Sequence, residues 1–232
     1  MISSPRNVST ALMYSFAQRA DTRVIDEPFY AYYLSRSGAD HPGRTEVLAA
    51  LPKNADGVFD LIGKAHDKPV LFIKGMAHHL DGIAPEKLAN MKSLFFIREP
   101  RQTIASFAQV IEHPTLRDIG SEMLCDLFDQ LTSLNAPVTV LDSGDLLRDP
   151  AGALEATCHS LGIAFDEHML KWSAGPRPED GVWAKHWYAN VHRTTGFAKQ
   201  VSSTRPLPES LRPLYEESLP YYERLRKHAI SF

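Results

Sequence analysis

The stretch SSPRNVSTALMYSFAQRA, residues 3–20, predicts a tight turn that leads directly into an amphipathic helix. Apolar side chains recur in it every three or four positions, which is the spacing of one buried helix face. These residues are Leu12, Met13, Phe16, Ala17 and Ala20. Asn7, Ser9 or Thr10 can cap the first turn, because their side-chain oxygens accept hydrogen bonds from free backbone N–H groups.

The start of this helix gathers groups that bind anions. The first N–H groups of a helix have no partner within it, and the helix dipole adds partial positive charge there. Arg6 supplies a guanidinium, and Ser9 and Thr10 supply hydroxyls. These groups predict an anion site, whereas the simpler interpretation is an ordinary capped helix after a surface turn. Other segments of the chain have to decide between the two.

The composition favours one α/β domain over residues 1–232. A chain of 232 residues that is 44% hydrophobic can bury one sizeable core. The formal net charge of −3 argues against a nucleic-acid partner. No apolar run reaches the roughly 18 to 20 residues that span a bilayer, so we expect no membrane association and a cytoplasmic location. Cys125 and Cys158 lack a metal or redox spacing and are expected as buried thiols.

Apolar runs alternate with helical patterns along the rest of the chain. The runs typical of buried parallel strands are residues 69–73, 93–97 and 137–141. Helical periodicity covers residues 58–65, 103–111, 122–134, 150–161 and 211–226, with the last helix restarting at Pro220. This alternation predicts an α/β fold with a doubly wound parallel sheet flanked by helices.

The first strand is expected to be truncated. A buried strand should deliver the chain into an anion-binding turn, yet only Met1, Ile2 and Ser3 precede that turn. Either the chain is clipped relative to its natural reading frame, or a neighbouring strand or a partner fills the gap.

Glu27 follows a very short predicted strand at residues 23–25, and Pro28 favours extended backbone before it. Ligands of open parallel sheets bind where the strands end, which makes Glu27 a candidate for chemistry. The alternative is a plain acidic residue in the first turn of the helical segment 29–34.

Cationic groups follow two further strands. Lys74 comes directly after one and Arg98 after the next, with Ser106 two turns into the helix that follows. Together with Arg6, these strand ends offer two planar guanidinium forks and one mobile ammonium. The set predicts a ligand that carries more than one phosphate-like group.

Two irregular segments are expected to shape a substrate pocket. Residues 31–56 contain Gly and Pro between short helical pieces, which is typical of a lid or an acceptor-side excursion. Residues 173–203 are rich in aromatic and hydrogen-bonding side chains. That loop either packs its tryptophans on the domain or closes over a nucleotide by stacking.

With these motifs in order, the chain resembles the P-loop sulfotransferases that use 3′-phosphoadenosine-5′-phosphosulfate (PAPS), in the bacterial and fungal branch whose loop is close to S-x-P-R-N-x-S-T. Residues 5–10 resemble the family's 5′-phosphosulfate loop, and residues 98–106 resemble its Arg and Ser pair for the 3′-phosphate. The resemblance implies a P-loop NTPase-like sulfotransferase fold. It also implies transfer of a sulfuryl group to a hydroxyl or amine of a small-molecule acceptor, which releases 3′-phosphoadenosine 5′-phosphate (PAP) and requires no metal.

The resemblance assigns cofactor contacts by position. Arg6 would contact the 5′-phosphosulfate, Arg98 with Ser106 would hold the 3′-phosphate, and the segment from Trp183 to Thr195 would fold over the nucleotide. The implied cofactor-binding residues are Arg6, Asn7, Val8, Ser9, Thr10, Arg98, Ser106, Trp183, Lys185, His186 and Thr195.

The implied catalytic residues leave the identity of the base open. Glu27 is the first choice, because Asp-Glu-Pro-Phe resembles the acidic motif of several sulfotransferase branches. His78 or His79 resembles the histidine that serves in the small-molecule branch, although either could be a structural hydrogen-bonding residue. Lys74 resembles the lysine at the end of the acceptor-side strand, and Arg6 completes the set.

Three other functions compete with this hypothesis. A catalytically silent protein would bind PAP without turnover. A small-molecule kinase would need ATP with Mg²⁺, but the chain has no G-x-x-x-x-G-K-[ST] loop. A zinc enzyme on His78, His79, His186 and His192 is disfavoured, because adjacent histidines rarely point at one metal. The identity of the acceptor and a homo-oligomeric state stay open.

Overall fold

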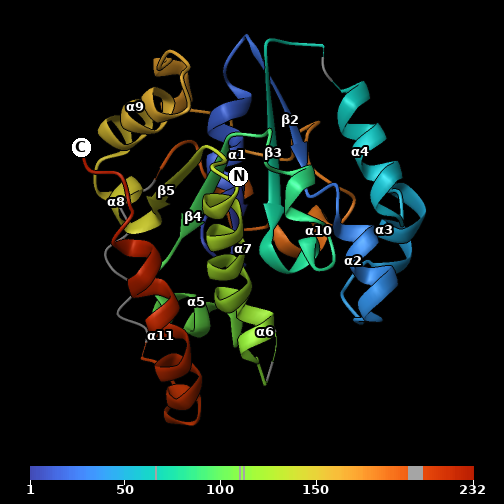
Figure 1. Ribbon diagram of the computed structural model, residues 1–232, viewed down its shortest axis with the longest axis vertical. Helices are drawn as coiled ribbons and strands as arrows, with labels where there is room; N and C mark the ends of the chain where they lie inside the picture. Colours follow the sequence, from blue (N-terminus) through green and yellow to red (C-terminus); the bar gives the residue numbers. More distant parts are fainter. Residues whose placement is uncertain (66, 110, 112, 198–205) are drawn as a thin grey trace.

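The computed structural model describes residues 1–65, 67–109, 111, 113–197 and 206–232, and a five-stranded sheet forms its centre (Figure 1). The strands are β1 (Ile2–Ser3), β2 (Thr22–Asp26), β3 (Val70–Met76), β4 (Ser93–Ile97) and β5 (Val138–Asp142). They pair in the order β2-β3-β1-β4-β5, and every pair is parallel. The doubly wound parallel sheet predicted from the sequence is confirmed.

The strand β1 is short, as predicted, but it occupies the middle of the sheet. Ile2 lies opposite Gly75 of β3 and Phe95 of β4, so its two residues join both neighbouring strands. The strand order reverses here, and open α/β sheets bind ligands outside the carboxyl ends of the strands at such a switch point. The loop after β1 therefore begins where the fold favours a ligand site.

Helices cover both faces of the sheet, because successive side chains of a strand point to opposite faces. Phe95 and Ile97 of β4 share a buried core with α4 (Ala55–Lys64), α7 (Ser121–Ser133) and α11 (Arg212–Arg226). Leu94 and Phe96 share another core with α1 (Ser9–Ala17) and α9 (Pro150–Ser160). The helices α7 and α11 lie side by side (Figure 1).

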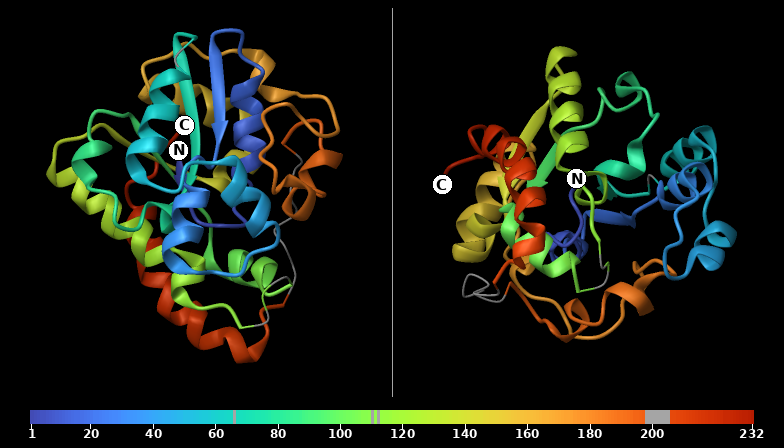
Figure 2. Two further views of the ribbon diagram at one scale, coloured as in Figure 1. Left: turned by 90° about the vertical axis from the view of Figure 1, so that its right-hand side faces the viewer. Right: turned by 90° about the horizontal axis from the view of Figure 1, so that it is seen from below.

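The remaining helices border the carboxyl ends of the strands and the start of α11. A third cluster joins α2 (Tyr30–Ser37), α3 (Arg44–Ala50) and α10 (Ala184–Trp187). A fourth joins α5 (Pro100–Phe107) and α6 (Leu116–Ile119) to α11, and α8 (Ser143–Arg148) directly precedes α9. Figure 2 shows the segment of residues 173–197, in orange, beside α1 and reaching toward α2 and α3.

Two predicted boundaries near the site are wrong. The strand β3 continues to Met76, so Lys74 lies inside the strand and not after it. The helix α5 begins at Pro100, because the Glu99 side chain accepts hydrogen bonds from two N–H groups of its first turn. It ends at Phe107 and does not reach residue 111.

Two further differences concern the helices α8 and α11. The helix α8 is absent from the predicted elements, and Asp142 caps it by accepting from two of its backbone N–H groups. The helix α11 runs through Pro220 without the predicted restart. Buried Leu214 and Leu225 anchor it on both sides of the exposed proline, which offsets the missing backbone hydrogen bond. In the described part of the chain, no helix combines the length and apolar character needed to cross a bilayer.

Candidate active site

A cavity of about 330 Å³ opens at the carboxyl ends of the central strands. Its walls come from the β1–α1 loop, the ends of β2 and β3, α5, and the segment of residues 183–194. The residues predicted for the site that line it are Arg6, Asn7, Val8, Ser9, Thr10, Glu27, Lys74, His78, His79, Arg98, Ser106 and Trp183. The structure therefore gathers most of the predicted site in one place.

The β1–α1 loop holds a backbone conformation that side chains rarely adopt. Arg6 has φ 61° and the β-branched Val8 has φ 59°. The Asn7 side chain anchors the loop by donating from Nδ2 to the backbone oxygen of Phe96 at 2.6 Å. The predicted side-chain cap is wrong, because Val8 precedes α1 and no side chain caps the helix. Strain of this kind persists where the surrounding structure enforces it, often at binding sites.

Two turn-helix units bring their cationic groups together beside this loop. Arg6 donates from Nε to the Oγ atom of Ser106 at 3.1 Å. Arg98 donates to the backbone oxygen of Arg6 at 2.5 Å and to Oε1 of Gln102 at 3.1 and 3.0 Å. Burial lowers the pKa of the Arg98 guanidinium, and the nearby charge of Arg6 lowers it further. A ligand with several anionic oxygens would relieve this repulsion.

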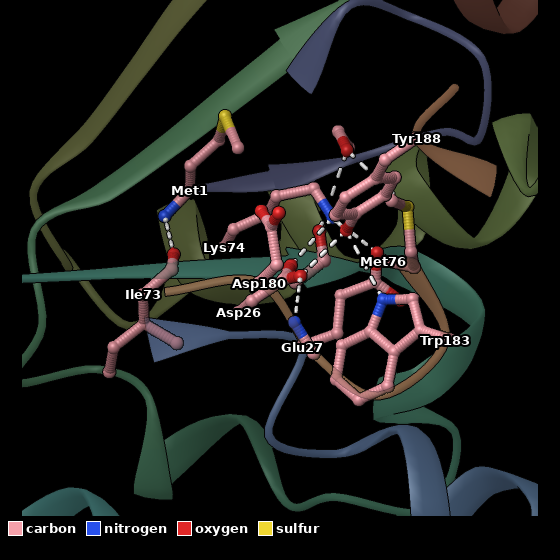
Figure 3. Close-up of polar contacts among 12 residues, drawn as sticks. Met1, Asp26, Glu27, Ile73, Lys74, Met76, Asp180, Trp183 and Tyr188 are labelled. Carbon is pink, nitrogen blue, oxygen red and sulfur yellow. Dashed lines mark hydrogen bonds and ion pairs between the residues drawn. The ribbon is translucent and has the colours of Figure 1, made fainter. Parts of the chain in front are cut away.

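The ammonium group of Lys74 lies in a buried cluster of its own (Figure 3). Residue 74 lies opposite Asp26 in the parallel β2–β3 ladder, so their side chains meet on one face. Lys74 Nζ donates to Asp26 Oδ1 at 2.9 Å, to Glu27 Oε1 and to the Tyr188 hydroxyl at 3.0 Å. Burial by itself lowers the pKa of Lys74, but the two carboxylates reverse this effect and raise it. Lys74 therefore stays charged and bound to these three partners. Its hydrogen bonds are separate from those that join Arg6 and Arg98.

Tyr188 locks the cluster from the C-terminal segment. Its hydroxyl donates to Asp26 Oδ2 at 2.6 Å, and it accepts from Nε1 of Trp183 at 3.2 Å. Burial raises the pKa of this hydroxyl well above its ordinary value, and the charges of Asp26 and Glu27 add to the shift. Tyr188 therefore remains a neutral hydrogen-bond donor.

Glu27 presents one carboxylate oxygen to the cluster and the other to His79. Its Oε1 accepts from Lys74, while its Oε2 lies 3.7 Å from Nδ1 of His79. The backbone adopts φ 39°, and its N–H donates to the backbone oxygen of Lys74 at 2.8 Å. Burial raises the pKa of the carboxyl; the charge of Lys74 opposes this shift and that of Asp26 adds to it. A cavity-lining carboxyl with a raised pKa is a candidate proton acceptor.

The two adjacent histidines are buried in neutral form. Burial lowers the pKa of His78 to about 3 and that of His79 well below its ordinary value. The Nδ1 atom of neither ring has a hydrogen bond to a described residue.

His192 lies apart, with Nε2 at 2.9 Å from Asp180 Oδ2. Within the described ranges, no three His, Cys, Asp or Glu side chains form a metal-binding group.

Three predicted cofactor-binding residues lie outside the cavity lining. Lys185 forms an exposed ion pair with Glu46 at 2.8 Å. The ring of His186 lies against Gly43. The backbone oxygen of Thr195 accepts from the backbone N–H of residue 172 at 3.1 Å. Residues 198–203 of the predicted covering loop lie outside the described residues, so the roles assigned to this loop stay predictions.

The structure adds site residues that sequence reasoning missed. The sequence contained a clue to Asp26, because this residue immediately precedes the candidate Glu27 at the end of a strand. Six cavity-lining rings contact one another in a connected group, which we call the aromatic wall: Tyr30, Tyr33, His41, His78, His79 and Trp187. Tyr188 and most of the wall had no local signal, because segments distant in sequence bring these side chains together.

Comparison with known proteins gives one family and two close relatives by sequence. The family model described as "Sulfotransferase domain" matches residues 1–229. Branched-chain-amino-acid aminotransferase-like proteins 1 and 2 of Arabidopsis thaliana are 41% and 37% identical over 228 and 229 residues. Each match covers 97% of this chain but only 41% of the relative, so the chain spans less than half the length of these relatives.

Three solved structures share the fold over almost their full lengths. They are a sulfotransferase domain from the curacin biosynthetic pathway (TM-score 0.56, 15% identity, 97% of this chain and 95% of that one), one from the olefin synthase of Synechococcus PCC 7002 (0.54, 17%, 93% and 92%), and a sulfotransferase from Alicyclobacillus acidocaldarius (0.56, 10%, 99% and 95%). At these identities the similarity shows the fold alone.

Proposed function

This chain belongs to the sulfotransferase domain family, and from that premise we propose that it transfers a sulfuryl group from PAPS to a small-molecule acceptor and releases PAP. The observation that carries the proposal is the convergence of Arg6, Arg98 and Ser106 beside the start of α1. Helix starts and arginine forks are the groups that proteins use to bind phosphate and related anions.

The donor nucleotide would be held through its anionic groups. The β1–α1 loop and Arg6 suit the phosphosulfate, because the first amides of α1 have no partner within the helix. Arg98 and Ser106 suit the 3′-phosphate, which distinguishes PAPS from ordinary adenine nucleotides. The hydrogen bond between Arg6 and Ser106 places the two proposed anion sites next to each other.

Sulfuryl transfer breaks the bond from sulfur to the phosphate oxygen and forms a bond from sulfur to the acceptor oxygen or nitrogen, while the acceptor loses a proton. We assign Glu27 as the proton acceptor. Burial raises the pKa of this carboxyl, whereas burial lowers the pKa of His78 and His79, so Glu27 gains basicity where the histidines lose it. Lys74 holds Glu27 Oε1 and thereby orients the carboxylate toward the cavity.

A second candidate is a nucleotide-binding protein without turnover. The observation that favours it is the commitment of Lys74 to Asp26, Glu27 and Tyr188, which keeps this ammonium from contacting the sulfuryl group. A sulfated product formed from PAPS would exclude this candidate.

Calorimetric titration with PAP, 5′-AMP and Mg-ATP tests the cofactor class. We expect PAP to bind most tightly and Arg98→Ala to weaken it by roughly 10- to 150-fold, the loss of one charge-assisted hydrogen-bonding group. AMP affinity should change little in this variant. Arg101→Ala is the matched control, because Arg101 follows Arg98 at the start of α5 and packs on Tyr215. Equal affinities of the wild type for PAP and AMP would contradict the proposal.

A further inference from the structure

The acceptor end of the cavity is built from rings. In the aromatic wall, Tyr30 stacks on His79 with ring centroids 4.6 Å apart. Tyr33 lies 4.9 Å from His78 and 5.0 Å from His79, and His41 lies 6.5 Å from Trp187. The wall continues from Glu27, whose Oε2 lies beside His79. Glu27 and these rings therefore line one cavity.

One carboxylate joins the wall inside the same cavity. Asp118 lines the cavity, and its Oδ2 accepts from the backbone N–H and hydroxyl of Thr115 at 2.8 and 2.7 Å. Burial lowers the pKa of His41 and His78. The negative charge of Asp118 opposes both shifts, whereas the positive charge of Arg44 adds to that of His41 and the positive charge of Arg117 adds to that of His78. The carboxylate thus acts directly on rings of the wall.

The positive charges near the wall lie outside the cavity lining or have carboxylate partners of their own. Lys74 is held by two carboxylates, and the three histidines have lowered pKa values. Arg117 binds Asp81 at 3.1 Å, and 65% of its side chain is exposed. Among the described residues, the cavity-lining guanidinium groups are those of Arg6 and Arg98 at the proposed donor end. The acceptor end therefore carries rings and negative charge.

We propose that the acceptor is a cationic alcohol, whose ammonium group lies against the aromatic wall near Asp118 and whose hydroxyl reaches Glu27. This inference rests on the proposed function and narrows its acceptor. Aromatic faces attract cations through the negative charge of the ring face, and a carboxylate beside them adds to that attraction. A carboxylate-bearing acceptor would meet repulsion from Asp118.

The charge of the acceptor also selects the reacting atom. A protonated amine has no lone pair to attack sulfur, whereas a hydroxyl has one. The hydroxyl oxygen bonds to sulfur, the bond from sulfur to the phosphate oxygen of PAPS breaks, and the hydroxyl proton passes to Glu27. The ammonium group, protonated or quaternary, takes no part in the transfer and serves only for recognition.

Binding of alcohols that match in shape but differ in charge, measured on the PAP-loaded protein, tests the inference. One pair is choline and its neutral isostere 3,3-dimethylbutan-1-ol; a second set is tyramine, its neutral isostere 4-propylphenol, and the anion 3-(4-hydroxyphenyl)propionate. At least one cation should bind roughly tenfold more tightly than its neutral isostere, and the anion should bind most weakly.

The variant Asp118→Asn should lower the preference for the cation to about threefold or less and leave the affinity for the neutral isostere within about twofold. Asparagine keeps an oxygen that can accept from Thr115, so the start of α6 retains its cap. Asp60→Asn removes the same charge from the exposed face of α4 and should leave every affinity unchanged. Trp187→Leu is a second variant, which should weaken cation binding more than neutral binding.

The outcomes separate this inference from the function on which it rests. If PAP binds but neither cation exceeds its neutral isostere, the cationic acceptor is excluded and the sulfotransferase proposal stands. If Asp118→Asn weakens both members of a pair equally and Trp187→Leu does the same, the wall does not recognise charge. If PAP itself fails to bind the wild type, the proposed function and the inference fall together.

Discussion

Glu27 combines a strained backbone, a buried carboxyl and access to the cavity. Its φ of 39° lies in the region that side chains rarely adopt, and such strain persists only where neighbouring contacts enforce it. Here the contacts are the backbone hydrogen bond to Lys74 and the ion pair with the same residue. The carboxyl therefore keeps one orientation, with its second oxygen directed toward His79.

We expect Glu27→Gln to lower kcat by roughly 10²- to 10⁴-fold, because an amide cannot accept the acceptor proton. In the wild type, kcat/KM should rise with pH through the raised pKa of Glu27, since only the ionised carboxylate acts as a base. The rate is thus lost as the pH falls through that pKa. Steady-state kinetics over a pH series measure both effects.

His78→Gln and His79→Gln provide the comparison for this prediction. Each should cost less than Glu27→Gln, and neither should remove the acidic limb of the pH profile. A larger loss in a histidine variant, with turnover retained in Glu27→Gln, would assign the base to that histidine.

At the scale of elements, the junction of α6 and α7 supports the wall. Gly120 ends α6 and precedes α7 with φ 70°, and it lies close to His78 and Ala77. The junction also places Asp118 on the cavity. Only glycine adopts this backbone conformation without steric cost, so the turn depends on this residue.

Gly120→Ala should lower the free energy of unfolding by about 1 to 2 kcal/mol, the cost of a left-handed conformation for an alanine. The cost is conformational, because the nearest atom to an added Cβ is at 3.7 Å, an ordinary contact. Urea denaturation measures the change.

Gly63→Ala is the matched control within α4, where an added Cβ meets no atom within 4 Å. It should raise the free energy of unfolding by roughly 0.5 to 1 kcal/mol, because alanine loses less chain entropy in a helix. If both Gly120→Ala and Gly63→Ala raised the free energy of unfolding, a side chain at position 120 would cause no backbone strain, and the prediction would be wrong.

At the scale of the whole molecule, Asp26 connects the sheet with the C-terminal segment. Its Oδ1 accepts from Lys74 on the neighbouring strand, and its Oδ2 accepts from Tyr188 at 2.6 Å and from the N–H of Gly181 at 3.3 Å. The same segment contacts α1 through the hydroxyl of Tyr14, which donates to Asp180 at 2.5 Å. One buried carboxylate thus links segments from the beginning, middle and end of the chain.

Asp26→Asn should lower the free energy of unfolding by about 3 kcal/mol, because it leaves the buried ammonium of Lys74 with a single carboxylate. It should also increase proteolytic cleavage within residues 173–197. Calorimetry and limited proteolysis measure the two effects.

Asp67→Asn is the control, since it removes an aspartate from an ion pair with Arg23 in which both side chains are about half exposed. Such pairs contribute little, so the unfolding transition should stay nearly unchanged. Equal transitions for the Asp26 and Asp67 variants would mean that the buried cluster does not hold the segment.

The predictable part of the site is the part that depends on local pattern. The positions of Arg98 and Ser106 follow from one strand and the helix after it. The sequence therefore predicted that both residues line one pocket with Arg6. The exit of Lys74 from its strand was misplaced, because an apolar run does not show where a hydrogen-bonded ladder ends. The helix α8 was missed for a related reason: it is short, and its start depends on the capping side chain of Asp142.

The sequence by itself determined the doubly wound sheet, the turn before α1 and the positions of Arg6 and Arg98 after their strands, because periodicity and turn chemistry act between near neighbours in the chain. The tertiary structure alone decided that Lys74 serves Asp26, Glu27 and Tyr188, the last of them 114 positions away. It also decided that rings from four segments line one cavity together with Asp118. These pairings depend on strand register and on the return of the C-terminal segment, and both are settled by burial of the whole core.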